Sequence, residues 1–527
     1  MDLIIKNAYI VDGTGAPGYH GDIGISGDTI EAIGQLEAGN VPQLDAAGRL
    51  VIPGIFDAHS HDELGIFRPD MAHSRIVQGI TFNIVGQCGA SPTPVCMERR
   101  DDLRNLYFEH SGGVRYDWNW TETHEYIDAV NAQKPSYNML YLVGHNTLRM
   151  YVMGVEDRKP TEAELEAMKG LLERSLQEGA AGLSLCLNNV PGKFSDVDEI
   201  AALAEVVKKY DGVICAHRRG EASNAEEAIE EMIEVTRRTG VRMVCSHVKI
   251  IGFANKGKAV KVLRMIEQAR AEGLDIRFDA YPYIEGFVQL FQIFPRWFWG
   301  MGADKVMENV ADPETCDKVV KEMQDDPYHD CYYCASAGAK GIRVKQCPDP
   351  KFDNKTLQQI SEETGEDPIR MALHIIRTYG PKVMMLCDLQ DREENVLIET
   401  HPKCSVSSDG APNQLKSHPR YLGSFAKILD YYVKQTGLLT LETAVHKMTG
   451  LTAECYKIKD RGVLRAGNKA DLVIIDWENF QDGTTFDNPS GLATGINYVF
   501  LNGKIAARDG VYTGEGVGGI IRGYELN

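Results

Sequence analysis

The sequence predicts an α/β protein built on a (β/α)8 TIM-like barrel, with a small β-sandwich domain formed by both chain termini and an insertion after barrel strand seven. Three observations support this prediction. Short apolar segments alternate with helical ones from about residue 50 to 283, as they do in parallel βα units. Short alternating segments punctuated by Gly and Asp stand at both chain ends, which is typical of antiparallel strands. The 527 residues also exceed one ordinary domain.

Both ends of the chain are predicted to contribute to the β-sandwich. Residues 1–50 hold the segments 3–11, 21–26 and 29–33, which are too few strands for an independent domain. Residues 461–527 return to the same pattern. We therefore expect the two ends to complete one domain together.

The predicted barrel places strands one to seven in residues 51–283, and strand eight with its closing helices in residues 401–460. Helical stretches separate the strands, such as 161–177, where acidic residues follow a capping Thr. Eight parallel strands favour a closed barrel, because closure leaves no unpaired edge. The candidate strands are 50–58, 80–86, 137–144, 180–187, 212–216, 241–246, 274–281 and 403–409.

The regular alternation stops after Tyr283. Residues 284–400 contain the aromatic run 294–299 and several amphipathic segments. Long segments that interrupt a regular pattern are often functional. We predict an insertion, or lid region, that covers or shapes a site.

Charge and apolar content exclude several classes of protein. Asp and Glu outnumber Lys and Arg by 75 to 56, giving a net charge of −19, which disfavours nucleic acid and anionic membranes as partners. No apolar run is long enough to span a membrane, and the chain starts in a strand-like segment without signal-peptide features. We therefore expect a cytoplasmic protein whose 12 Cys are reduced. The single Cys-x-x-Cys, Cys331 to Cys334, lacks a second ligand pair and is interpreted as structural.

Side chains suited to metal binding or proton transfer stand where the predicted strands end. His59 and His61 end strand one and project to the same side, because side chains alternate along a strand. Of 14 His in the chain, five fall at strand ends, His145 among them. A barrel gathers its reactive groups at those ends, and imidazole, thiolate and carboxylate all bind zinc. The predicted metal-site residues are His59, His61, Cys88, His217, His247 and Asp409.

These motifs resemble those of the amidohydrolase superfamily, and specifically of the N-acyl-D-amino-acid deacylases (D-aminoacylases). The resemblance extends over essentially the whole chain, and the Cys after strand two is its most specific element. The motifs that carry it are residues 53–61, 86–89, 144–149, 279–283, 408–410 and 441–450.

The resemblance implies a zinc-dependent hydrolase of linear amides. Cys88, His217 and His247 would hold a tightly bound zinc ion, whereas His59, His61 and Asp409 would surround a weaker second position. Zinc lowers the pKa of its bound water to near neutrality. Asp409 would accept that water's proton and deliver it to the leaving nitrogen. A neighbouring imidazole, His61 or His145, would help to stabilise the oxyanion.

The resemblance also implies a small-molecule substrate that carries an amide and a carboxylate. Lys249 and Tyr283, or alternatively Tyr281, would bind the α-carboxylate. Arg296, in the aromatic run of the insertion, is a second candidate cation.

Departures from the family pattern leave the substrate open. Arg218-Arg219-Gly220-Glu221-Ala222 replaces the usual Met-Arg-Asp-Glu-Gly run after His217, and Val248 stands where a second His is common. The preferred function is hydrolysis of N-acyl-D-amino acids, and a cyclic amide hydrolase of the hydantoinase or dihydroorotase kind is the main alternative. A deaminase is less favoured, and a metal-free scaffold homologue would be expected to lack ligands that are present here. Whether the chain forms a homo-oligomer stays open.

Overall fold

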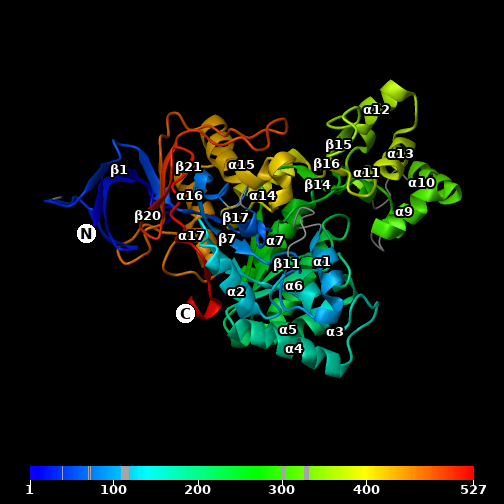
Figure 1. Cartoon of the computed structure of the whole chain (residues 1–527), viewed down its shortest axis with the longest axis horizontal. Coiled ribbons are helices and arrows are strands. Elements are labelled where there is room, and N and C mark those ends of the chain that lie inside the picture. Colours follow the sequence, from blue (N-terminus) through cyan, green and yellow to red (C-terminus); the bar gives the residue numbers. More distant parts are fainter. Residues whose placement is uncertain are drawn as a thin grey trace.

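A sheet from both chain ends, a central α/β body and a group of helices follow one another along the molecule (Figure 1). This computed structural model describes residues 1–37, 39–68, 71, 73–108, 118–299, 303–325 and 332–526. The predicted α/β class is confirmed.

The two chain ends form one nine-stranded sheet, in the order β21-β20-β19-β18-β5-β1-β2-β3, with β4 beside β1. The link is β5, which pairs in parallel with β1 and antiparallel with β18, where Leu472 lies opposite Pro53. Strands from both ends of the chain thus share one sheet. Its strands are β1 (Leu3–Ile10), β2 (Tyr19–Ser26), β3 (Thr29–Gly34), β4 (Gln43–Asp45), β5 (Leu50–Pro53), β18 (Leu472–Ile475), β19 (Ile496–Leu501), β20 (Lys504–Arg508) and β21 (Val511–Tyr512).

A strand forms in every segment predicted for the barrel, and neighbouring strands pair in parallel. They belong to two sheets, β17-β13-β12-β11-β10-β9 and β22-β8-β7-β6. The strands besides β22 are β6 (Ile55–Asp57), β7 (Ile80–Val85), β8 (Asn138–Tyr141), β9 (Val143–Gly144), β10 (Gly182–Cys186), β11 (Val213–His217), β12 (Arg242–Cys245), β13 (Ile276–Ala280) and β17 (Cys404–Val406).

The first and last of these strands lie side by side. The amide of Ala58 donates to the carbonyl of Val406 at 3.3 Å, and the amide of Asp409 donates to the carbonyl of His59 at 2.9 Å. A parallel bridge also joins Ser60 to Gly410. These bonds place the residues that follow β6 next to those that follow β17.

The end of the chain does not stay in the terminal sheet. Residues 461–527 were assigned to the β-sandwich, but β22 (Ile520–Ile521) pairs in parallel with β8. Ile520 is buried among the apolar side chains of the α/β body. The last residues therefore pack against the central body, which corrects that assignment.

Helices cover the outer face of the parallel strands. Thr161 caps α4 by accepting from the amide of Glu164, and Gly240 ends α6 in the left-handed region at φ 67°. In the part of the chain that the structure describes, no helix is long and apolar enough to cross a membrane. The helices are α1 (Arg100–Phe108), α2 (Thr123–Ala132), α3 (His145–Val152), α4 (Glu162–Gln177), α5 (Val197–Lys209), α6 (Ala225–Thr239), α7 (Lys258–Ala271), α14 (Arg392–Thr400), α15 (Arg420–Lys427), α16 (Leu441–Met448) and α17 (Gly450–Cys455).

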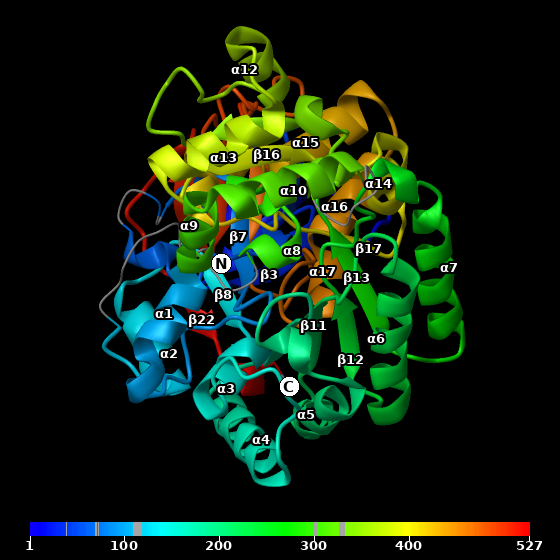
Figure 2. The same cartoon turned by 90° about the vertical axis from the view of Figure 1, so that its right-hand side faces the viewer.

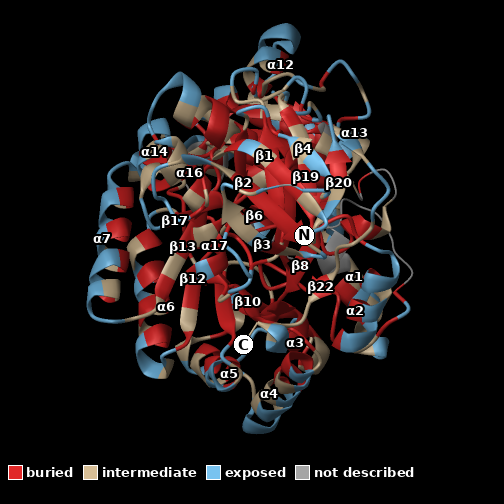
Figure 3. Cartoon of the chain, turned by 90° about the vertical axis from the view of Figure 1, so that its left-hand side faces the viewer, coloured by how far each residue is buried: buried red, intermediate tan, exposed pale blue. Residues whose placement is uncertain are grey.

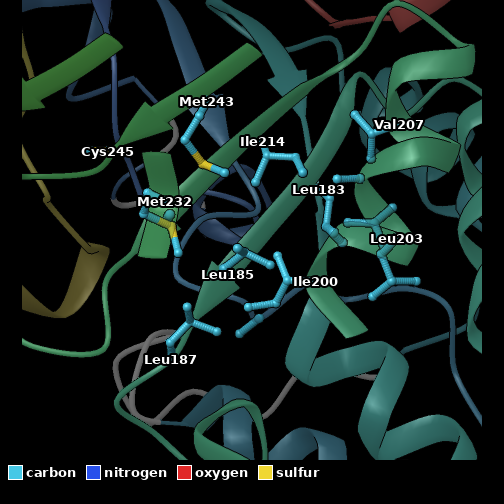
Figure 4. Close-up of a cluster of buried hydrophobic side chains, with 14 of the residues drawn as sticks. Leu183, Leu185, Leu187, Ile200, Leu203, Val207, Ile214, Met232, Met243 and Cys245 are labelled. Atoms are coloured by element: carbon cyan, nitrogen blue, oxygen red, sulfur yellow. The ribbon is translucent and has the colours of Figure 1, made fainter. Parts of the chain in front are cut away.

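The main hydrophobic core lies between these helices and the strands (Figure 4). Ile200, Leu203 and Val207 recur at helical spacing on α5 and pack against Leu183 and Ile214 of the neighbouring strands. Each such buried side chain contributes about 1.5–3 kcal/mol of transfer free energy. Figure 3 shows the result, with buried strands inside and exposed outer helix faces. This packing fixes the strand ends that carry the candidate ligands.

The insertion forms its own core beyond β13. An antiparallel sheet, β14-β16-β15, packs with helices whose buried side chains form a separate apolar cluster. Figure 2 shows α8, α9, α10 and α13 together on the side facing the viewer. The elements are β14 (Glu285–Gln289), α8 (Arg296–Trp299), α9 (Ala303–Ala311), α10 (Pro313–Asp325), α11 (Tyr332–Ala335), β15 (Ile342–Lys345), α12 (Leu357–Thr364), α13 (Pro368–Tyr379) and β16 (Met384–Asp388).

Candidate metal centre

Three of the predicted ligands converge at the ends of three parallel strands. Cys88 follows β7, His217 ends β11 and His247 follows β12. Sγ of Cys88 lies 3.6 Å from Nδ1 of His217 and 3.5 Å from Nε2 of His247. The two imidazole rings meet edge to face, with centroids 4.4 Å apart. The structure thus brings Cys88 to two His that follow it by 129 and 159 residues.

This spacing fits a tetrahedral zinc ion. Zn–S bonds of about 2.3 Å and Zn–N bonds of about 2.0–2.1 Å place sulfur and nitrogen about 3.5 Å apart. The two separations above match that value, and thiolate sulfur and imidazole nitrogen are both zinc donors. The donor atoms of Cys88, His217 and His247 therefore fit a metal ion, which these three residues would hold.

The other three predicted residues border the same point. Nε2 of His59 lies 3.3 Å from Sγ of Cys88 and 3.6 Å from Oδ1 of Asp409. Nε2 of His61 lies 3.4 Å from the same carboxylate oxygen. His59, Cys88, His247 and Asp409 form one group that could hold a metal ion. All six predicted residues thus lie in one cluster.

The backbone is unusual at three of these residues. Cys88, His247 and Asp409 adopt positive φ angles of 50°, 35° and 47°, a left-handed conformation that costs free energy in residues other than Gly. Hydrogen bonds hold two of them: the amide of His247 donates to Oδ1 of Asp279, and the amide of Asp409 donates to the carbonyl of His59. Such strain is concentrated at functional sites.

Burial and neighbouring charges set the protonation of the cluster. Burial lowers the pKa of His59 and His217 well below the usual range, so both imidazoles are neutral and able to bind a metal. Burial would raise the pKa of Asp409, but Arg420 and the imidazoles outweigh it and hold that pKa well below its usual range. Burial raises the pKa of the Cys88 thiol well above its usual range, and a bound metal ion stabilises a thiolate in such surroundings.

A second group of His217, Glu221 and His247 also has metal-ligand spacing. Here a cation is already present. Nζ of Lys249 lies 3.1 Å from Oε1 of Glu221 and 2.7 Å from Nδ1 of His247. On the far side of His217, Asn188 lies 2.8 Å from Nε2. These contacts leave the Cys88 side of the two imidazoles as the better metal position.

Two of the predicted carboxylate-binding residues lie together beside the cluster. Nζ of Lys249 is 5.5 Å from the centroid of the Tyr281 ring. Arg420 stacks on the same ring at 5.2 Å. Tyr283 instead packs its ring against Lys427, at 3.9 Å, and His418, at 5.3 Å. Of the two Tyr alternatives, the structure therefore brings Tyr281 to Lys249.

Two further residues predicted to contribute to substrate binding are His145 and Arg296. Nε2 of the fully buried His145 lies 2.7 Å from Oε1 of Glu199, and Arg149 bonds the other oxygen of that carboxylate. This contact directs Nε2 of His145 toward α5, and a role of His145 at the substrate stays a prediction. The side chain of Arg296, like the Cys331–Cys334 pair, lies outside the described residues.

Three contributors were missed by sequence reasoning. Arg420 donates from Nη1 to Oδ2 of Asp409 at 2.8 Å, Glu221 contacts His247 and Lys249, and Asn188 contacts His217. Glu221 had a usable signal, because it stands four residues after His217, where the usual family run also has Glu. Asn188 follows the predicted strand 180–187 and so stood at a strand end. Arg420 is the first residue of α15 and had no such signal.

The whole chain is similar to known deacylases. N-acyl-D-glutamate deacylase of Alcaligenes xylosoxydans xylosoxydans is 33% identical over 505 residues, which cover 95% of this chain and 93% of that protein. The crystal structure of N-acyl-D-glutamate deacylase from Bordetella bronchiseptica, complexed with zinc and a phosphonate that mimics the tetrahedral intermediate, matches with a TM-score of 0.79 at 31% identity and 99% coverage of each chain.

A third similar protein is D-aminoacylase, in a structure that addresses one-metal activation and second-metal attenuation at its binuclear centre. It matches with a TM-score of 0.80 at 30% identity, again with 99% coverage of each chain. The model of the amidohydrolase family matches residues 43–291 and 395–507. With most of its length matched by that model and its predicted ligands gathered at the strand ends, this chain belongs to the amidohydrolase family.

Proposed function

We propose that this chain is a zinc-dependent hydrolase that cleaves the amide bond of N-acyl-D-amino acids, releasing a carboxylate and a free D-amino acid. The observation that carries the proposal is the convergence of Cys88, His217 and His247 next to the carboxylate of Asp409. The similarity to zinc-bound N-acyl-D-glutamate deacylase over nearly the full length supports it.

The chemistry divides between the ion and the chain's own residues. Zinc, when bound by Cys88, His217 and His247, would supply a water of lowered pKa and a Lewis acid for the substrate carbonyl. Asp409 accepts the proton of the attacking water and delivers it to the leaving nitrogen, which departs poorly without it. Arg420 keeps Asp409 ionised at the start of the cycle. His61, whose Nε2 lies 3.4 Å from Oδ1 of Asp409, would donate to the developing oxyanion.

A second, weaker metal position would involve His59, His61 and Asp409. Oδ1 of Asp409 lies 3.6 Å from Nε2 of His59 and 3.4 Å from Nε2 of His61. An ion there would occupy the carboxylate that moves protons, so we propose that the enzyme works with the Cys88 position alone filled.

The substrate's α-carboxylate would bind between two cations. Lys249 and Arg420 both contact the Tyr281 ring, and fixed cations with a phenol next to them form a suitable carboxylate site. Tyr281 therefore replaces Tyr283 in this role. This clamp would orient the amide toward the strand ends.

The proposed architecture is a closed (β/α)8 barrel with a β-sandwich from both termini. The bonds between Ala58 and Val406 and between His59 and Asp409 support closure. We propose the domains 1–50, 51–283, 284–400, 401–460 and 461–519, with the chain end returning to the barrel. The separate apolar core of the insertion, and a family match that omits 292–394, support this division.

An activity screen of the zinc-loaded protein tests the proposal. Paired D- and L-N-acyl amino acids and hydantoins would be offered, and released amine or ring opening would be measured. We expect hydrolysis of N-acyl-D-amino acids, with the L isomers at least tenfold slower. Ring opening without amide hydrolysis would replace the proposal by a cyclic amide hydrolase.

A further inference from the structure

Glu221 is a buried carboxylate to which the metal cluster and the proposed carboxylate clamp both connect. Its side chain is 5% exposed. Oε1 lies 3.2 Å from Nδ1 of His247, 3.1 Å from Nζ of Lys249 and 3.2 Å from Nη2 of Arg218. Oε2 lies 3.8 Å from Nε2 of His217. One side chain thus contacts two predicted metal ligands and two cations.

Glu221 offers the hydrogen-bond acceptor that the His247 ring needs when it binds a metal ion. Nε2 faces Cys88, so a metal ion at that position takes the lone pair of Nε2. Nδ1 must then carry the ring hydrogen and needs an acceptor. Oε1 of Glu221 is that acceptor at 3.2 Å. A carboxylate in this position fixes the ring and increases its basicity.

Lys249 depends on the same oxygen. In the described structure its Nζ also lies 2.7 Å from Nδ1 of His247, a bond that is lost once Nδ1 carries a hydrogen. Its remaining acceptors are Oε1 of Glu221 at 3.1 Å and the carbonyl of His247 at 3.2 Å. Glu221 therefore holds the ammonium group beside Tyr281 when the ion is bound.

The negative charge of Glu221 also affects the metal site and the cations beside it. Lys249 and the buried guanidinium of Arg218 both contact Glu221, which lies next to His247, a residue that would hold a dication. The carboxylate of Glu221 offsets this accumulation of positive charge. Without it, the cations would oppose metal binding, and Arg218 and Lys249 would lose their shared partner.

We propose that Glu221 is a positioning residue that couples the metal site to substrate recognition, by holding His247 for the metal and Lys249 for the substrate carboxylate. The second half of this inference rests on the proposed function, whereas the first half depends only on metal binding. Glu221 acts through its two neighbours and does not itself contact the reacting atoms.

Zinc affinity tests the first half. Glu221→Gln keeps the shape of the side chain and removes its charge. Titration of the apoprotein with Zn²⁺ against a competing chelator should show affinity about 10- to 100-fold weaker than wild type, in the range seen for such carboxylate partners. Glu221→Asp, which restores the charge, should recover part of the loss.

Glu199→Gln is the matched control. Glu199 is equally buried and also bonds one imidazole and one guanidinium, those of His145 and Arg149, outside the metal cluster. Glu199→Gln should lower the melting temperature and leave the zinc affinity within about twofold of the wild-type value. Equal zinc affinity in wild type and Glu221→Gln would overturn the inference, whatever the substrate proves to be.

A double-variant cycle tests the second half with zinc-saturated protein and N-acetyl-D-glutamate. Glu221→Gln should raise KM about tenfold with a smaller change in kcat. In a Lys249→Met background it should raise KM less than twofold, because the group it positions is gone, while still weakening zinc. Independent KM effects would refute the coupling. Inactivity of the zinc-loaded wild type in the screen would instead remove the proposed function and leave the zinc result to stand.

Discussion

Arg420 donates from Nη1 to Oδ2 of Asp409 at 2.8 Å, while Oδ1 of the same carboxylate faces His59 and His61. One oxygen is thus held by a permanent cation, and the other faces two imidazoles of the cluster. In the proposed mechanism, this division would let Asp409 stay ionised and still exchange a proton.

Replacement of Arg420 by Met should change the pH profile. Burial alone would raise the pKa of Asp409, and Arg420 is the largest influence that lowers it. Without Arg420 the pKa of Asp409 rises, so this base becomes protonated at a higher pH. The acidic limb of the pH–kcat profile should therefore move to higher pH. We also expect kcat/KM to fall about 10- to 100-fold, as for loss of a charged hydrogen bond. A pH–rate series would check this, and an unmoved acidic limb would separate Arg420 from the protonation of Asp409.

Asp409→Asn should separate metal binding from turnover. The three proposed ligands Cys88, His217 and His247 remain, so one zinc per chain should stay bound, as measured by atomic absorption. Loss of proton transfer should reduce kcat about 10²- to 10⁴-fold. Activity near that of wild type would exclude Asp409 as the proton carrier.

Lys249→Met should affect only substrates that carry the α-carboxylate. Loss of an ion pair of about 1.5–3 kcal/mol raises KM about 10- to 150-fold for an N-acyl-D-amino acid. The corresponding N-acyl amine, which lacks the carboxylate, should be hydrolysed equally by both proteins. If the variant impaired both substrates alike, Lys249 would be acting on the fold or the metal and not on the carboxylate.

Glu399 should make stability depend on pH. Burial raises its pKa to about 8, above the unfolded value, although Lys447 opposes the shift. Above pH 4.5 the unfolded chain loses this proton while the folded chain keeps it, so the group destabilises the fold progressively up to about pH 8. Between pH 5 and 8, the free energy of unfolding of Glu399→Gln should therefore increase relative to that of wild type. The difference should grow with pH and reach on the order of a few kcal/mol. Melting temperatures of both proteins across this range would show it, and a constant difference would contradict it.

Much of the fold and most of the metal cluster could be predicted from the sequence, for a physical reason. The segments that became β10 and β11 are continuous apolar runs because both of their faces are buried. In parallel units the reactive side chains must follow such runs. That rule locates His217 and His247 without knowledge of tertiary contacts.

The rest depends on contacts that no local pattern encodes. Side-chain alternation puts Tyr281 and Tyr283 on one face, but β13 ends at Ala280 and the chain then turns, so only Tyr281 meets Lys249. His145 stands at a strand end as expected, yet its side chain pairs with Glu199 of α5. The return of Ile520 to β8 is decided by packing across almost the whole chain. Pairings of this kind are set by tertiary structure alone.

The central claim is that Cys88, His217 and His247 hold one catalytic zinc ion. X-ray absorption at the zinc edge, on protein loaded with one equivalent of metal, tests it most directly. We predict one sulfur ligand at about 2.3 Å and nitrogen or oxygen ligands at about 2.0–2.1 Å, with the sulfur contribution absent in Cys88→Ser. A zinc environment without sulfur in the wild type, or one unchanged in Cys88→Ser, would contradict the claim.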